Sequence, residues 1–239
     1  MSIIKLKEVN STNLYAKEHL SELADKTVII ADRQTNGRGR FDRVWVDLGG
    51  DNLFMSIVLK PSDKFLNVYP NLTQYLSVVV CKVLEYYGLQ PNIKWPNDVL
   101  IKGKKISGIL SETVTQGNNL KGIVLGLGVN LNSDNETLSS IKDKEATALN
   151  IELSRDIDKD EFTEKLTSEF FRFYDEFLRK GFVFVRDEYL KRACFLESEI
   201  SVRVFNDVKS GFVKSINDDG ELVLENDKKE FVLTMGDIL

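Results

Sequence analysis

Four short runs of β-forming residues lie between residues 92 and 130, and the links between them are short and rich in turn-forming residues. The links contain Pro96-Asn97-Asp98, Lys102-Gly103-Lys104 and Gly117-Asn118-Asn119, compositions that are typical of tight turns. Links of hairpin length join antiparallel strands, because a parallel pair needs a much longer crossover. The sequence therefore predicts a largely antiparallel sheet as the framework of the chain.

Helical and further strand patterns surround these runs. Spacing predicts a helix after Ser11-Thr12-Asn13, a second over 72–87, and a third over 161–180 that carries a stripe of phenylalanines. Short β-branched or apolar runs at 27–31 and 52–59 predict two more strands. Residues 132–150 are polar and are expected to form a mobile loop or a short helix. The fold class is α+β, with a mixed, largely antiparallel sheet flanked by helices.

The pattern changes near residue 197 to a two-residue period. Ile200, Val202 and Val204 alternate with polar residues, and more short apolar runs follow, separated by turns such as Asn217-Asp218-Asp219-Gly220. This is typical of a small antiparallel β-module. We expect a body in residues 1–195 and a compact C-terminal β-barrel in residues 196–239.

Composition limits the partners of the chain. The formal net charge of −5 and the pI near 5.2 oppose binding to nucleic acid over a broad surface. No apolar run approaches the ~18 residues that a membrane span requires, and the N-terminus shows no signal peptide. Cys81 and Cys194 are far apart, which predicts two buried structural thiols and neither a disulfide framework nor a zinc site. We expect a cytoplasmic protein without nucleic-acid or membrane partners.

Several common catalytic sites are absent from the sequence. There is no phosphate-binding loop of the G-x-x-x-x-G-K-[ST] type, and Leu131 stands where a third glycine would complete a dinucleotide motif after Gly126-Leu127-Gly128. His19 is the only histidine and lies in a predicted surface helix, which argues against a histidine-based triad or a histidine-rich metal site. The chemistry must therefore use lysine, arginine, carboxylates, backbone amides or a metal that arrives with the substrate.

The segment from Gln34 to Trp45 is the strongest functional signal. It places Arg38, Arg40 and Arg43 on a backbone that contains two glycines and ends on an aromatic residue. Glycine allows the main chain to approach a ligand closely, and arginine presents a planar set of donors that fits carboxylate and phosphate oxygens. In an acidic chain this arginine loop predicts a site for a small anion.

Three other segments accompany the arginine loop: Lys94-Trp95-Pro96-Asn97-Asp98, Lys104 to Glu112, and Gly126-Leu127-Gly128-Val129-Asn130. Taken alone, the first is typical of a plain turn, the second of a solvated hairpin end, and the third of glycines that accommodate packing. Glycine inside a strand, as at Gly108, also marks the close approach of a ligand. Their occurrence together favours a ligand site.

These residues resemble the catalytic core of biotin protein ligases over nearly the whole chain. The resemblance rests on the order and spacing of Ser11-Thr12-Asn13, Gln34, GRGR at 37–40 with Arg43 and Trp45, KWPND at 94–98, Lys105 with Gly108, and GxGxN at 126–130. It implies a class II synthetase-like, biotin–lipoyl ligase catalytic domain in residues 1–195 and a barrel of the Src-homology-3 type in residues 196–239. The chain differs from the family in two respects. Regulatory members carry an N-terminal helix-turn-helix domain, which this chain is expected to lack, and Phe41-Asp42 stands where many members have basic or small residues.

The resemblance implies a two-step reaction. Biotin and MgATP give biotinyl-5′-adenylate and pyrophosphate, and biotin is then transferred to a lysine of a biotin carboxyl carrier protein, or of the corresponding domain of a carboxylase or decarboxylase. ATP and Mg²⁺ are the implied cofactors, and a monomer or a homodimer is expected. Because the adenylate hydrolyses in water, the arginine loop and residues 132–150 are expected to close over it.

The resemblance also assigns roles to residues. Lys105 and Arg40 are the expected catalytic cations, and no metal ligands are expected in the chain. The expected biotin-binding residues are Ser11, Thr12, Asn13, Gln34, Gly37, Arg38, Gly39, Arg40, Lys105 and Gly108. The expected ATP-binding residues are Arg40, Arg43, Trp45, Lys105 and Asn130, with Trp45 as a stacking surface for adenine.

Three alternatives remain open. A lipoate or octanoate protein ligase or transferase shares the broad architecture and the adenylate chemistry. A biotin-responsive regulator without catalysis, and an α+β ligand-binding module with degenerate catalytic residues, are of another class. The presence of Lys105 and of all three arginines argues against the last.

Overall fold

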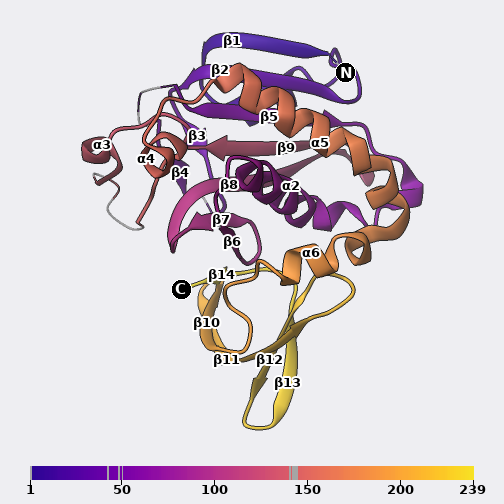
Figure 1. Cartoon of the computed structure of the whole chain (residues 1–239). Helices are drawn as coiled ribbons and strands as arrows, with labels where there is room; N and C mark the ends of the chain where they lie inside the picture. Colours follow the sequence, from indigo (N-terminus) through magenta and orange to yellow (C-terminus); the bar gives the residue numbers. More distant parts are fainter. Residues whose placement is uncertain (1, 42, 48, 50, 140, 142–144) are drawn as a thin grey trace.

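A seven-stranded mixed sheet forms the body of the molecule in the computed structural model, which describes residues 2–41, 43–47, 49, 51–139, 141 and 145–239 (Figure 1). Its strands are β1 (Ile3–Val9), β2 (Thr27–Gln34), β5 (Leu53–Leu59), β6 (Pro91–Lys94), β7 (Asp98–Ile101), β8 (Lys104–Gln116) and β9 (Asn119–Val129). They are arranged in the order β1-β2-β5-β9-β8-β7-β6.

Strand pairing in this sheet is antiparallel except between β1 and β2, which are parallel. The antiparallel pairing predicted for residues 92–130 is therefore confirmed. β1 was not predicted, because it lies at the edge of the sheet and its mostly half-exposed or exposed residues include the lysines that interrupt its apolar pattern. A separate two-stranded hairpin, β3 (Gly37–Arg38) and β4 (Val44–Trp45), carries the two arms of the arginine loop.

Helices cover both faces of the large sheet. The α-helices are α1 (Thr12–Glu18), α2 (Leu72–Tyr86), α3 (Asn135–Ser139), α4 (Leu149–Leu153), α5 (Lys159–Lys180) and α6 (Arg186–Leu190), and short 3-10 turns lie at Asp63–Phe65, Tyr69–Asn71 and Gly181–Phe184. Helices α2 and α5 pack together on one face of the sheet (Figure 1). The three helices predicted from spacing correspond to α1, α2 and α5.

Alternation along the strands separates the two cores. Val28 and Ile57 belong to the large apolar cluster that α2 and α5 cover, whereas Ile29 and Val58 face a smaller cluster under α1. Neighbouring strand residues point to opposite faces, which explains this division. The phenylalanines of α5 contribute to the large cluster, as predicted from their spacing.

The C-terminal residues form a five-stranded antiparallel sheet. Its strands are β10 (Glu199–Val204), β11 (Asp207–Ile216), β12 (Leu222–Asn226), β13 (Lys229–Leu233) and β14 (Asp237–Ile238), in the order β13-β12-β11-β10-β14. Within residues 199–238, all of which are described, no pairing joins β13 to β14, so this module is a sheet with two edges and its pairing does not close the expected barrel.

The C-terminal sheet packs directly on the body. Side-chain amides of Asn71 and Gln74 donate hydrogen bonds to the carbonyl oxygens of Asp219 and Gly220, at 2.7 and 2.6 Å. Apolar residues of the sheet, such as Val213, share the large core cluster of the body. The division into domains at residues 195 and 196 stays a prediction.

Two other expectations concern the cysteines and membranes. Both cysteines are free; Cys81 is buried as expected, but Cys194 is exposed, so the prediction of two buried thiols was wrong for Cys194. Within the described part of the chain, no helix combines the length and the apolar character needed to cross a membrane.

Candidate functional site

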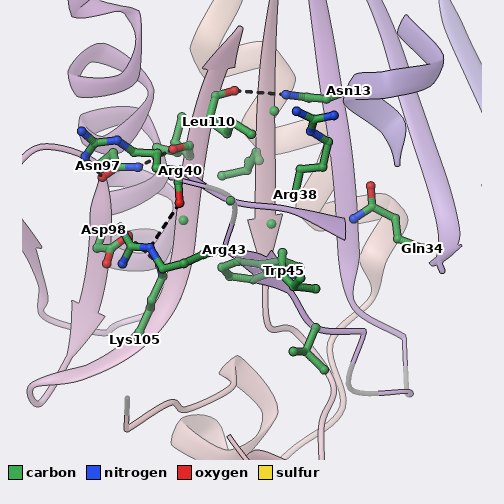
Figure 2. Close-up of a pocket in the computed structure, with 18 of the residues that line it drawn as sticks. Asn13, Gln34, Arg38, Arg40, Arg43, Trp45, Asn97, Asp98, Lys105 and Leu110 are labelled. Carbon is green, nitrogen blue, oxygen red and sulfur yellow. Dashed lines mark hydrogen bonds and ion pairs between the residues drawn. The ribbon is translucent and has the colours of Figure 1, made fainter. Parts of the chain in front are cut away.

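A cavity of ≈ 430 Å³ opens beside the arginine loop, where β8 and β9 form its floor (Figure 2). Its size falls within the usual range for small-molecule sites. The cavity brings together every predicted site residue except Gly37. These lining residues are Ser11, Thr12, Asn13, Gln34, Arg38, Gly39, Arg40, Arg43, Trp45, Lys105, Gly108 and Asn130.

Gly37 lies in the β3–β4 hairpin and is not a lining residue. A Cβ atom added at Gly37 would lie 2.3 Å from the carbonyl oxygen of Trp45, its partner on β4. The requirement for glycine here is therefore structural, because the hairpin cannot form around a larger residue.

One end of the cavity carries neutral polar side chains. The backbone N–H and the hydroxyl of Thr12 both donate to Oε1 of Gln34, at 2.7 and 3.2 Å. Because a backbone N–H can only donate, this contact identifies Oε1 as the acceptor and orients the Gln34 amide. Ser56 on β5 lies 2.8 Å from Thr12 Oγ1 and 2.6 Å from Asn13 Oδ1. This end can recognise a ligand that carries uncharged donors and acceptors.

The opposite end is cationic. Nζ of Lys105 lies 2.6 Å from a carboxylate oxygen of Asp98, and both side chains are largely buried. Nη1 of Arg40 donates to Oδ1 of Asn97 at 3.3 Å, and Figure 2 shows these four side chains on the same side of the cavity. Clustered cations beside buried polar groups favour the binding of an anion.

The C-terminal sheet also contributes to the cationic end. Nη1 of Arg40 donates to the carbonyl oxygen of Gly236 at 3.0 Å and lies 3.2 Å from the carboxylate of Asp237. Arg43 forms an ion pair with the other oxygen of the same carboxylate. Burial lowers the pKa of Arg40 below its ordinary value, and the charge of Asp237 opposes that shift.

Trp45 lies in the centre of the cavity on a floor of glycines. Gly108 on β8 is the register partner of Gly128 on β9. Cβ atoms added at these two positions would lie 2.9 and 2.4 Å from the indole ring. The ring therefore occupies space that only glycines leave open.

The surroundings of Trp45 change one expectation. Trp45 is half-buried, and its indole nitrogen is buried without a hydrogen-bond partner among the described residues. The space above Gly108, expected to hold a ligand flat on the strand, is occupied by the Trp45 ring in this structure. Lys105 Nζ lies 5.3 Å from the centre of that ring, a cation–π distance.

A segment from the predicted 132–150 loop forms another wall. Ile141 and Ala146 line the cavity, and Lys105 exchanges backbone hydrogen bonds with Glu145 and Thr147, each at 2.9 Å. Nδ2 of Asn130 donates to the carbonyl oxygen of Thr147 at 3.0 Å. A mobile loop or a short helix was expected in residues 132–150; the described part contains the short helix α3, and α4 begins at its end.

Asp42, which was singled out as a departure from the family, lies outside the described residues. Phe41 is described, and its backbone φ of +52° is unusual for a residue with a bulky side chain. Its ring meets the Phe205 ring of the β10–β11 turn edge to face, with 5.9 Å between centroids. The arginine loop therefore contacts the C-terminal sheet through both charge and apolar surface.

Several residues of the site were not predicted. Asp237 lies in the C-terminal module, where no sequence motif indicated a site residue. Ser56 lies in a strand whose other residues are apolar, so the sequence predicted only core packing there. Glu112 ends the predicted segment Lys104 to Glu112 but was not itself singled out. Its carboxylate accepts a hydrogen bond from Asn13 and forms an ion pair with Arg38. Among the described residues, no group of three or more histidine, cysteine, aspartate or glutamate side chains could hold a metal ion; that the chain provides no metal ligands stays a prediction.

Comparisons with known proteins agree with this geometry. The model of the "Biotin/lipoate A/B protein ligase family" matches residues 5–130. The bifunctional ligase/repressor BirA of Bacillus subtilis (strain 168) is 33% identical over 223 residues, which cover 92% of this chain and 68% of that protein. The biotin--[acetyl-CoA-carboxylase] ligase of Paracoccus denitrificans is 30% identical over 227 residues, with 92% of each chain covered.

A solved structure gives the same result for the fold. The biotin protein ligase from Aquifex aeolicus, in complex with biotin and ATP, superposes with a TM-score of 0.83 at 26% identity and covers 100% of this chain and 97% of its own. The family model spans more than half of the chain, and the relative from Paracoccus denitrificans aligns over nearly its full length. The chain belongs to the biotin/lipoate A/B protein ligase family.

Proposed function

We propose that this chain is a biotin protein ligase, which activates biotin with MgATP and transfers it to a lysine of a biotin carboxyl carrier protein or domain. The observation that carries the proposal is one cavity with a neutral polar end at Thr12 and Gln34 and a cationic end at Lys105 and Arg40. Biotin has the matching chemistry, because its ureido ring is uncharged and its carboxylate lies at the other end of the molecule.

The first step brings two anions together. An oxygen of the biotin carboxylate attacks the α-phosphorus of ATP, and the bond from that phosphorus to the departing pyrophosphate breaks. Repulsion between the reactants and their alignment are the main barriers, and preorganised cations reduce both. Lys105, Arg40 and Arg43 supply these cations at the end of the cavity where the carboxylate and the phosphates meet, and MgATP brings Mg²⁺ as part of the substrate.

The second step consumes the adenylate. The uncharged amine of the carrier lysine attacks the acyl carbon of the mixed anhydride, the bond to the AMP oxygen breaks, and the amine loses a proton as the amide forms. No histidine is required, because AMP is a good leaving group. The cations that stabilise the phosphate in the first step also stabilise the departing AMP.

We assign the expected binding roles by position in the cavity. Ser11, Thr12, Asn13 and Gln34 line the neutral end for the ureido ring, with the backbone at Arg38 and Gly39 nearer the carboxylate. We assign the nucleotide to the part of the cavity beside Lys105, whose Nζ lies 5.3 Å from the centre of the Trp45 ring, with Asn130 as a further lining residue. In this structure the Trp45 ring lies on Gly108 and Gly128, so the ring must shift to stack on adenine.

The test is direct. The chain is incubated with biotin, MgATP and a biotin acceptor domain, pyrophosphate release is followed, and mass spectrometry locates the modified lysine. Parallel reactions replace biotin with lipoate or octanoate, because the family includes lipoate ligases. Of the three acids, only biotin should support pyrophosphate release and modification of the acceptor lysine. An unmodified acceptor, or preference for lipoate, would overturn the proposal.

A binding measurement complements the assay. A ligand that binds only the folded state raises its stability, so saturating biotin with MgATP should increase the melting temperature. A catalytically inert regulator would bind biotin without releasing pyrophosphate, which separates that alternative from a ligase. That the chain is a monomer or a homodimer stays a prediction.

A further inference from the structure

Glu112 of β8 lies just outside the cavity, where three side chains from two parts of the chain, α1 and the arginine loop, converge on its carboxylate. Oε2 accepts a hydrogen bond from Asn13 Nδ2 at 3.0 Å. Oε1 lies 2.9 Å from Lys17 Nζ on α1 and 3.4 Å from Arg38 Nη2 in the arginine loop. Glu112 does not line the cavity, whereas Asn13 and Arg38 do. Any effect of Glu112 on a ligand must therefore act through those two residues.

The Asn13 amide has little freedom. Its two N–H groups donate to Glu112 and to the carbonyl oxygen of Leu110, at 3.0 and 3.3 Å, and its Oδ1 lies 2.6 Å from Ser56 Oγ. A Cβ atom added at Gly126 would lie 2.2 Å from Oδ1, so the amide packs tightly on β9. Figure 2 shows Asn13 bonded across to Leu110. Both amide donors are thus directed into β8, which leaves the edge of Oδ1 as the polar surface that can face a ligand.

Arg38 has a different relationship to the same carboxylate. It lies on β3, the first arm of the arginine loop, and its side chain is 44% exposed. The Arg38 guanidinium is directed to Glu112, whereas Arg40 and Arg43 are held by Asp237 at the other end of the cavity. The loop is therefore tied at two places by two carboxylates, one beside each end of the cavity.

The environment of Glu112 favours its ionised form. Burial raises the pKa of this carboxyl group, but hydrogen bonds from Lys17 and Asn13, together with the charges of Lys17 and Arg38, outweigh it and leave the pKa below its ordinary value. A charged carboxylate that is 14% exposed and has three partners is a strong local constraint.

We propose that Glu112 is a positioning residue for the biotin half of the site, because it fixes the orientation of Asn13 and ties the first arm of the arginine loop over the neutral end. The proposal rests on the proposed function and adds a residue to it that does not touch the substrate. Its consequence is selective: loss of the carboxylate weakens biotin binding and leaves the nucleotide end, which is tied through Asp237, intact.

The test compares Glu112→Gln with Lys17→Met, a matched control that removes another partner of the same carboxylate. Glu112→Gln keeps the size of the side chain, and it should raise the KM for biotin roughly tenfold while the KM for ATP stays within about twofold. Lys17→Met should keep both KM values near those of the unchanged protein, since Lys17 does not line the cavity and Glu112 keeps its contacts with Asn13 and Arg38. Equal losses in the two variants would overturn the proposal, because they would show a general effect on α1.

A double-mutant cycle with Arg38→Met provides the second measurement, and its added substitution is at a side chain that is 44% exposed. The exposed Arg38 side chain can be shortened without disturbing the core. If the ion pair transmits the effect, Glu112→Gln should raise the dissociation constant of biotin, measured by calorimetry, much less in the Arg38→Met background than alone. Full additivity would overturn the proposed tie. Failure of the proposed role of Glu112 is distinguishable from failure of the proposed function, because the unchanged protein must first be shown to bind biotin and release pyrophosphate.

Discussion

The carboxylate of Asp237 forms ion pairs with Arg40 and Arg43, although 197 and 194 residues separate Asp237 from these arginines in the chain. Gly236 makes this approach possible, because a Cβ atom at that position would lie 2.5 Å from Val202 on the neighbouring strand. The C-terminal sheet therefore completes the cationic end of the cavity. Four predictions test what individual residues of the site contribute to ligand binding, catalysis and stability.

The first prediction concerns Asp237 itself. Asp237→Asn removes the charge that holds two guanidinium groups together, so Arg40 and Arg43 should separate and hold the phosphates less well. We expect the KM for ATP to rise about tenfold, with a smaller change for biotin, since partly buried pairs contribute moderately. Steady-state pyrophosphate release with each substrate varied measures both values.

A control for this variant is available in the same sheet. Glu225 pairs with Lys214 at 3.3 Å and does not line the cavity. Glu225→Gln neutralises a carboxylate of the C-terminal sheet and should leave both KM values unchanged. A lower KM for ATP in Asp237→Asn would contradict the prediction, because it would show that Asp237 competes with the nucleotide.

The second prediction separates binding from chemistry at Lys105. Lys105→Ala removes a cation next to the reacting groups, and loss of such a group typically costs about a hundredfold or more in kcat. Biotin alone should still bind, because the neutral end is unchanged. Single-turnover adenylate formation and calorimetry with biotin measure the two effects. Full adenylation by the variant would contradict the assignment of Lys105 and reopen the non-catalytic alternative.

The third prediction uses two glycines of β9 that lie under different residues of the cavity. A methyl group at Gly126 would collide with Asn13, and one at Gly128 with the Trp45 ring. Gly126→Ala should therefore weaken biotin binding, and it should lower the free energy of unfolding by about 1–3 kcal/mol, the usual cost of overpacking. Gly128→Ala should act mainly on ATP by displacing Trp45. Identical effects of the two substitutions on both ligands would contradict this division.

The fourth prediction is a pH dependence of stability. The folded-state pKa of Glu112 lies below its ordinary value of 4.5, so its charge stabilises the fold above that pH, and the contribution is lost as the pH falls through the folded-state pKa. Urea unfolding should show Glu112→Gln to be less stable than the unchanged protein at neutral pH. The difference should disappear well below pH 4.5. A difference that persists in acid would assign the loss to packing instead of charge.

The sequence predicted most elements whose periodicity is strong. The hairpins from β6 to β9 follow from turn-rich links, and α5 follows from its phenylalanine stripe. Strand β1 was not predicted, because it lies at the edge of the sheet and its lysines interrupt the apolar pattern. The short helices α3, α4 and α6 have five residues each, too few for a periodic signal.

The site was predictable where chemistry and sequence spacing coincide. Arg40, Lys105 and Asn130 belong to compact motifs, so their convergence could be expected from the resemblance. Asp237 and Ser56 could not be found in this way, because they enter the site only through long-range packing and carry no motif of their own. The position of Trp45 on the glycines was also unpredictable, since register pairing of β8 with β9 decides which glycines are neighbours.

The position of Trp45 has an optical consequence. The sequence contains two tryptophans, and of these only Trp45 lines the cavity, whereas Trp95 is 2% exposed in the core. The emission of an indole depends on its polar surroundings, and the Trp45 nitrogen has no hydrogen-bond partner among the residues the structure describes. A ligand that moves the ring or supplies an acceptor will change the fluorescence of this residue. The protein thus carries an intrinsic probe with which stopped-flow mixing can time the arrival of each substrate without a label.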